Sequence, residues 1–162
     1  PITRASPTNS RLRPDRMPRY FTLAEARAAL PLVGPIIREA VLAKSRFTEA
    51  EKALQDLSRR ILMMGGINVD TSVAESWKSQ YDSSGQTLKS ALERIEAMGI
   101  LVKDLDIGLI DFPTLFHGQE VYLCWRMDED NIGHWHGVHE GFKGRRPIDK
   151  HFIDNHRGET MP

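Results

Sequence analysis

The longest pattern in the sequence is a run of apolar positions spaced alternately three and four residues apart. It extends from Val33 to Met64 and is flanked by charged side chains, as in an amphipathic helix that packs against one partner. At about 1.5 Å per residue, a helix over residues 33–64 would be roughly 48 Å long. Gly65 and Gly66 follow it and predict its end. The apolar seam consists of Val33, Ile36, Ala40, Ala43, Phe47, Ala50, Leu54, Leu57, Ile61 and Met64.

A second run with the same spacing covers residues 72–98 and predicts another long helix. Ser72 is followed three positions later by Glu75, which is the capping-box pattern, so Ser72 is expected to cap the helix N-terminus. Gly99 predicts its end. Because a short glycine-containing connection joins the two helices, we expect them to fold back into an antiparallel, coiled-coil-like hairpin.

A shorter helical segment precedes the hairpin. Thr22 and Glu25 form a further capping box, which predicts a helix that starts there. Pro31 and Pro35 interrupt the pattern, because proline lacks the backbone N–H and clashes with the preceding helical turn. We therefore predict a short helix, followed by a new helix that has Pro35 in its first turn.

Beyond the second helix the apolar period changes to two, which predicts short strands. Strands are expected over residues 100–104 and 109–112, and Pro113 is expected to close the second of them. Residues 120–127 alternate between apolar and polar side chains, and residues 132–138 are the expected hairpin partner after an acidic turn. The sequence thus predicts a small antiparallel sheet within residues 100–138.

These elements predict an α+β fold in a single domain over residues 20–148. A chain of 162 residues and 18.4 kDa suits one hydrophobic core. Residues 1–19 are basic and contain several prolines, so they are expected to form an unpacked tail, with Met17 as an alternative start. Residues 149–162 are expected to be a polar tail.

Composition excludes several classes of protein. Since 22 Lys and Arg balance 22 Asp and Glu, the whole molecule has no field that gathers polyanions, and a nucleic-acid partner is expected only through the basic tails. No apolar run reaches the roughly 18 residues that span a bilayer. The segment before Tyr20 has no hydrophobic centre of a secretory signal. The single cysteine, Cys124, excludes an internal disulfide, and we expect a cytoplasmic protein.

The candidate chemistry lies in the C-terminal part, because all six histidines fall within residues 117–156. His134 and His136 are two residues apart and share a face if they lie in a strand, and His139 and Glu140 follow directly. Imidazole and carboxylate groups that converge at one edge suit zinc or another divalent ion. A metal site at His136 and Glu140 is therefore one interpretation.

Whether the cysteine joins this cluster depends on the register of the hairpin. A symmetrical register that pairs Met127 with Ile132 sets Cys124 opposite Trp135, because paired residues share a face. In that register the thiol lies on the other face from both histidines. The register therefore predicts a histidine site without a thiolate ligand.

Two candidate residues, His136 and Arg145, also have an ordinary structural interpretation. His136 fits a core histidine beside Trp125, hydrogen-bonded to a backbone carbonyl or to Glu140. Arg145 lies in a glycine-rich loop, where a guanidinium can bind a carboxylate or phosphate ligand. The alternative is a surface ion pair with Glu140 or Asp111.

Four segments of the chain carry a resemblance to a known family. Read in order, they resemble a bacterial family catalogued as domain of unknown function 2203, over roughly residues 20–148. The resemblance implies a long helical hairpin followed by a small sheet, and it implies no activity. The segments are Tyr20-Phe-Thr-Leu-Ala-Glu-Ala, Gly108-Leu-Ile-Asp-Phe-Pro, Val121-Tyr-Leu-Cys-Trp-Arg and Trp135-His-Gly-Val-His-Glu-Gly-Phe-Lys-Gly-Arg-Arg-Pro.

The closing segment of the family pattern changes the choice of candidate residues. His134 and His139 are not part of that pattern, which weakens a His-x-His metal site. The resemblance instead favours His136, Glu140 and Arg145, with Asp111 and Cys124 near them in the motifs. The matching positions in this chain are Trp135, His136, Glu140, Gly141, Phe142, Gly144 and Arg145.

The leading functional interpretation is a non-enzymatic interaction or assembly module. A lone hairpin of this length leaves one side of each helix uncovered, so we expect self-association or docking of a partner helix. The first alternative is a small metal- or anion-binding protein or hydrolase, with His136 and Glu140 as ligands or acid and base and Arg145 as the anion contact. Its cofactor would be a divalent metal such as zinc. In the second alternative, the basic tails attach the domain to RNA or to a large complex.

Overall fold

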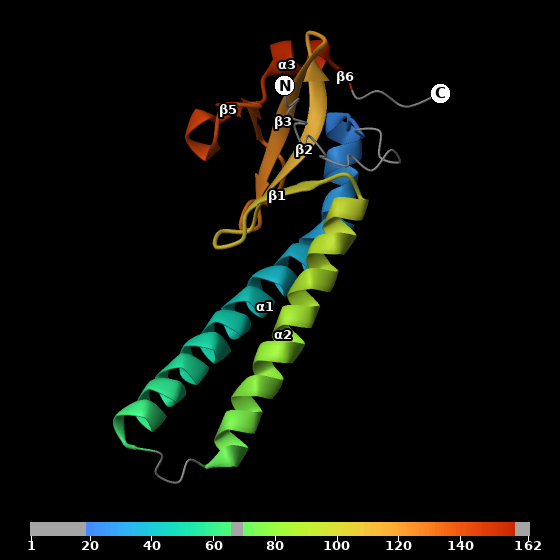
Figure 1. Ribbon diagram of the computed structural model, residues 1–162. Helices are drawn as coiled ribbons and strands as arrows, with labels where there is room; N and C mark the ends of the chain where they lie inside the picture. Colours follow the sequence, from blue (N-terminus) through green and yellow to red (C-terminus); the bar gives the residue numbers. More distant parts are fainter. Residues whose placement is uncertain (1–18, 66–69, 158–162) are drawn as a thin grey trace, which may run out of the picture.

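The computed structural model describes residues 19–65 and 70–157. Two long helices, α1 (Leu23–Met63) and α2 (Thr71–Ala97), lie side by side as an antiparallel hairpin that projects from a small sheet (Figure 1). The expected α+β fold with a helical hairpin and a C-terminal antiparallel sheet is confirmed. The basic N-terminal tail lies outside the described residues except for Arg19.

Side chains cap both helix starts. At α1, Thr22 is the N-cap as predicted, and its Oγ1 accepts a hydrogen bond of 3.1 Å from the Glu25 backbone N–H. At α2 the predicted cap is wrong, because Asp70 is the N-cap and accepts from the Ser72 N–H at 3.0 Å. The Ser72 hydroxyl also donates to Asp70, at 2.6 Å, so it contacts the N-cap residue and is not the cap itself. An aspartate satisfies the free N–H groups of a helix start as well as a serine does.

The predicted break between a short helix and the first long helix is wrong. α1 continues through Pro31 and Pro35 without interruption. Each proline removes one backbone hydrogen bond, but Val33 and Ile37, each two residues after a proline, are completely buried against the sheet. Burial of this helix face outweighs the lost hydrogen bonds, and tertiary packing decides the local conformation.

The two helices approach closely where α2 has small side chains. The rings of Phe47 on α1 and Tyr81 on α2 stack with centroids 4.4 Å apart. A Cβ at Gly85 would lie only 3.2 Å from the Phe47 ring, so a larger residue there would push the helices apart. The run of poor helix formers around Gly85 thus provides room for an aromatic contact.

The sheet is antiparallel, with strand order β1-β2-β3-β4-β5 and the short β6 paired with the far end of β2. One face of β2 and β3 packs on the N-terminal half of α1, where Val33 and Ile37 meet Phe112, Leu123 and Trp125 in the core. The bounds are β1 Leu101–Asp104, β2 Leu109–Phe116, β3 Gln119–Arg126, β4 His134–Gly137, β5 Arg146–Pro147 and β6 His156–Arg157, with a 3-10 turn at Phe142–Gly144 and a helix α3 at Lys150–Asn155.

The prediction that Pro113 ends the second strand is wrong, because β2 runs on to Phe116. Along a strand, the backbone N and O of one residue point to the same edge. The Pro113 carbonyl accepts a hydrogen bond of 2.7 Å from the Phe21 N–H, so the nitrogen of Pro113 also points to the edge where Phe21 lies. At Pro113 no neighbouring strand pairs with this edge of β2. The pairing with β1 ends at Asp111, and the pairing with β6 begins at Leu115. The missing N–H of proline therefore breaks no bond between strands.

Residues that follow Ile148 pack on the domain, in contrast to the predicted polar tail. Phe152 on α3 is 1% exposed and stacks on Phe116 and Trp135, with ring centroids 4.9 and 5.0 Å away. A single apolar anchor in a polar stretch produces no periodicity, which is why the sequence pattern missed it. Residues 158–162 lie outside the described part.

Candidate functional site

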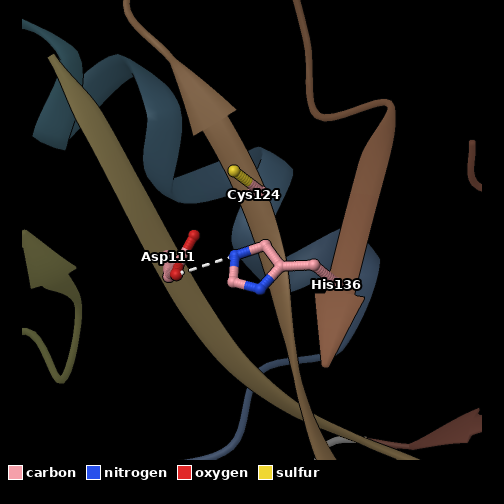
Figure 2. A group of neighbouring side chains, drawn as sticks. All are labelled: Asp111, Cys124 and His136. Atoms are coloured by element: carbon pink, nitrogen blue, oxygen red, sulfur yellow. Dashed lines mark ion pairs between the residues drawn. The ribbon is translucent and has the colours of Figure 1, made fainter. Parts of the chain in front are cut away.

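Three side chains from neighbouring strands converge on the face of the sheet turned away from α1. Asp111 on β2 and Cys124 on β3 are directly opposite each other, and His136 on β4 lies opposite Tyr122, two residues from Cys124. Because side chains alternate along a strand, this face is the reverse of the one that carries Trp125. Figure 2 shows the three side chains in front of the sheet and the helix behind it.

The three groups are close together and almost completely buried. Their possible ligand atoms, a carboxylate oxygen, the thiol sulfur and a ring nitrogen, all lie within 4.8 Å of one another. Asp111 and Cys124 have no exposed surface, and His136 is 3% exposed. His136 Nε2 lies 3.0 Å from Asp111 Oδ2 (Figure 2). Buried ionisable groups are costly unless they are paired or bind a cation, so this cluster requires a physical explanation.

The hydrogen bond on the other side of the ring indicates the tautomer of His136. Its Nδ1 lies 2.8 Å from the Gly137 carbonyl oxygen. A carbonyl can only accept, so Nδ1 carries a proton and donates it. In the neutral imidazole, Nε2 then presents its lone pair to Asp111 and Cys124.

Burial dominates the electrostatics of the other two groups. Desolvation raises the pKa of Asp111, and the nearby His136 and Cys124 offset only part of this effect. Neither oxygen of Asp111 receives a well-aligned hydrogen bond from the described residues, because the contact with His136 has the distance but not the alignment of one. Desolvation, increased by the charge of Asp111, raises the pKa of Cys124 to about 12. Without a cation, this cysteine is a thiol and a poor nucleophile.

Comparison with family models accounts for most of the chain. Residues 19–148 match the model of domain of unknown function 2203 (DUF2203), described as an uncharacterized conserved protein. The chain belongs to this family. Searches of curated proteins and of solved structures found no match. Asp111, Cys124 and His136 all lie within the matched residues of the DUF2203 domain.

The other sequence-predicted site residues of the DUF2203 domain do not join this cluster. Glu140 accepts hydrogen bonds from the Gly137 N–H at 2.9 Å and from Arg146 at 2.6 Å, and the bond from Gly137 lowers the pKa of Glu140. Arg145 donates to both carboxylate oxygens of Glu129, at 2.5 and 2.8 Å. Both arginines of the loop are therefore paired with carboxylates, which agrees with the ion-pair interpretation but changes the partner of Arg145.

The predicted hairpin register is wrong by one residue. Cys124 pairs with His134 rather than with Trp135, so the cysteine shares its face with His134 and His136. The physical reason is the packing of Trp135, which lies on the other face and contacts Phe116 at 4.9 Å between ring centroids. The packing of Trp135 therefore determines the register of the two strands, in place of the predicted symmetrical turn.

The environment of the histidines agrees with the prediction only in part. His136 is buried and hydrogen-bonded to a backbone carbonyl, as the core-histidine interpretation expects. His136 packs edge-on against Tyr122, with ring centroids 5.6 Å apart, instead of beside Trp125. His134 has a buried Nδ1 without a hydrogen-bond partner among the described residues, and it is not within the cluster of three. His139 is exposed in the turn after β4. Of the histidines proposed as ligands, only His136 lies in the cluster with Asp111 and Cys124.

The described helices can also be compared with the requirements of a membrane span. None of them combines the length and the apolar character that a membrane crossing requires.

Proposed function

We propose that this DUF2203 protein is a non-enzymatic assembly module whose hairpin end pairs with a second copy of the chain. The observation that carries this proposal is the lack of cover at the end of the hairpin. Among the described residues after Ala50 on α1 and before Ser84 on α2, none is buried. Leu62 and Met63 are 84% and 81% exposed. Exposed apolar side chains in one region are typical of a binding surface.

The exposed region includes an open groove that is lined mainly by one face of α1. Leu54, Leu62 and Tyr81 supply its apolar surface, between α1 and α2. Glu51 and Arg59 line the same groove. The end of the hairpin that carries this groove lies far from the sheet (Figure 1), so a second hairpin can approach it without meeting the sheet.

The order of charges along the groove favours a second copy as the occupant. In an antiparallel pair related by a two-fold axis, a residue on one side of the axis faces the partner residue that is equally far from the axis on the other side. Glu51 of one copy then faces Arg59 of the other, and the axis passes near Gln55, midway between them. Four helices in this arrangement form a bundle, which buries apolar stripes that two helices leave exposed.

Replacing Leu62 by lysine is expected to weaken the pair at least about tenfold, because a charge in an apolar interface costs more than about 1.4 kcal/mol. The measurement is the molar mass by light scattering over a dilution series of the full chain. Lysine near a helix C-terminus does not oppose the helix dipole, so the helix itself is preserved.

Leu32→Lys is the matched control, since Leu32 is 66% exposed on the same helix but at the sheet end. It should leave the mass of a dimer unchanged. A wild-type chain that is monomeric at all concentrations, or an equal loss in both variants, would contradict the proposal. The proposal would also be contradicted if the hairpin end bound a different protein and did not self-associate.

A further inference from the structure

Independently of the assembly role, we infer that Asp111, Cys124 and His136 form a site for a divalent cation of the zinc class. The inference rests on the convergence of three ligand types at one buried point of the sheet. Their ligand atoms lie within 4.8 Å of one another, a separation that one metal ion can bridge. Each side chain comes from a different strand, so the hydrogen-bonded sheet holds them in place.

The unpaired acceptors are the first argument for a cation. In the neutral imidazole, whose Nδ1 donates to the Gly137 carbonyl, the Nε2 lone pair faces Asp111 Oδ2 at 3.0 Å. Two acceptors at this distance repel each other unless a proton or a cation is shared. Asp111 Oδ1 likewise receives no well-aligned hydrogen bond from the described residues, although the residue is completely buried. A metal ion would satisfy these atoms together.

The donor set indicates which cations fit. Thiolate and imidazole ligands favour zinc and similar transition metals, whereas magnesium and calcium require sites made of oxygen. One thiolate and one carboxylate balance the two positive charges of the ion, so the loaded site is neutral, as burial demands. Loading replaces the thiol proton of Cys124 by the metal and releases that proton to solvent.

The surroundings of the histidine agree with this assignment. Metal-binding histidines generally donate their second ring N–H to a carbonyl or carboxylate, as His136 does to Gly137. Three protein ligands leave one coordination position of a tetrahedral ion for water or a small ligand. Glu140, the other candidate ligand, is held in an ion pair with Arg146 outside the cluster and is not needed as a ligand.

Titration of the chelator-treated, untagged protein with Co²⁺ tests the inference directly. Cys124 is the single cysteine of the chain, so a thiolate-to-cobalt charge-transfer band reports this site alone. We expect the band to saturate at one ion per chain and to disappear when Zn²⁺ is added. Cys124→Ser should abolish it, and Asp111→Asn should weaken binding more than about 100-fold, since even indirect partners contribute 10–100-fold.

The control addresses a second pair of histidines on the surface. His117 Nε2 and His151 Nε2 are 3.1 Å apart and exposed, and they can also attract Co²⁺. His117→Ala should leave the thiolate band unchanged. Circular dichroism of each metal-free variant checks that the fold is retained. The inference is overturned if the folded wild-type protein gives no band, or if His136→Ala binds with unchanged affinity.

Discussion

Replacing Phe112 by alanine is expected to lower the free energy of unfolding by about 3–5 kcal/mol. Phe112 is completely buried on β2, and its ring meets that of Phe21 edge-on with centroids 5.3 Å apart. Truncation removes apolar burial and leaves a cavity between the sheet and α1, where the strands and the helix prevent collapse. Urea unfolding followed by circular dichroism measures the loss.

Phe142→Ala is the matched control for this substitution. Phe142 is 38% exposed in the 3-10 turn and contacts the guanidinium groups of Arg126 and Arg145. Its truncation should cost about 1 kcal/mol or less, because exposed cation–π contacts are weak. Similar losses in the two variants would show that the core does not lie between the sheet and α1.

In the metal-free protein, Asp111→Asn is expected to raise the free energy of unfolding at neutral pH, by about 1–3 kcal/mol. The wild-type carboxylate is buried without a well-aligned hydrogen bond, and asparagine removes the charge at nearly constant volume. Ligand residues often reduce stability in this way. Saturating zinc should reverse the order of stability, because only the wild-type site retains its carboxylate ligand.

The pH dependence of this effect follows from the direction of the pKa shift. Burial raises the pKa of Asp111 in the folded state above its ordinary value of 3.8, so the folded state binds the proton more readily. The loss of stability caused by burying Asp111 is therefore absent below the pKa of Asp111 in the unfolded state. It develops as the pH rises through the pKa of Asp111 in the folded state. Urea unfolding in the presence of chelator should show that Asp111→Asn is more stable than wild type at pH 7 and equally stable near pH 4. A less stable variant at neutral pH would mean that the pair with His136 stabilises the fold.

The helical part of the fold could be predicted because apolar side chains recur along each helix with a helical period. The seam from Val33 to Met64 predicts the part of α1 that ends at Met63, since its period reports one helix face, but it misses the first ten residues of the helix. The error at Pro31 and Pro35 arises because local rules omit the packing of that helix face on the sheet. For the same reason the pattern could not find Phe152, whose ring packs on Phe116 and Trp135, both far from it along the chain.

The candidate site was harder to predict, because it depends on register across three strands. In the sequence, the clustering of the histidines points to His136. Only their positions in the family motifs point to Asp111 and Cys124. A shift of one residue moves the cysteine from one face of the sheet to the other. That shift follows from the packing of Trp135, which becomes visible only when the sheet and α3 are assembled.

Disulfide crosslinking of Gln55→Cys tests most directly whether the hairpin ends pair. Gln55 is exposed and lies nearest the two-fold axis that the charges of Glu51 and Arg59 favour, whereas native Cys124 is buried and cannot crosslink. Under mild oxidation we expect a covalent dimer in this variant and none in Ser90→Cys, an exposed position nearer the sheet. Equal, slow crosslinking at both positions would contradict the antiparallel pairing of two hairpins.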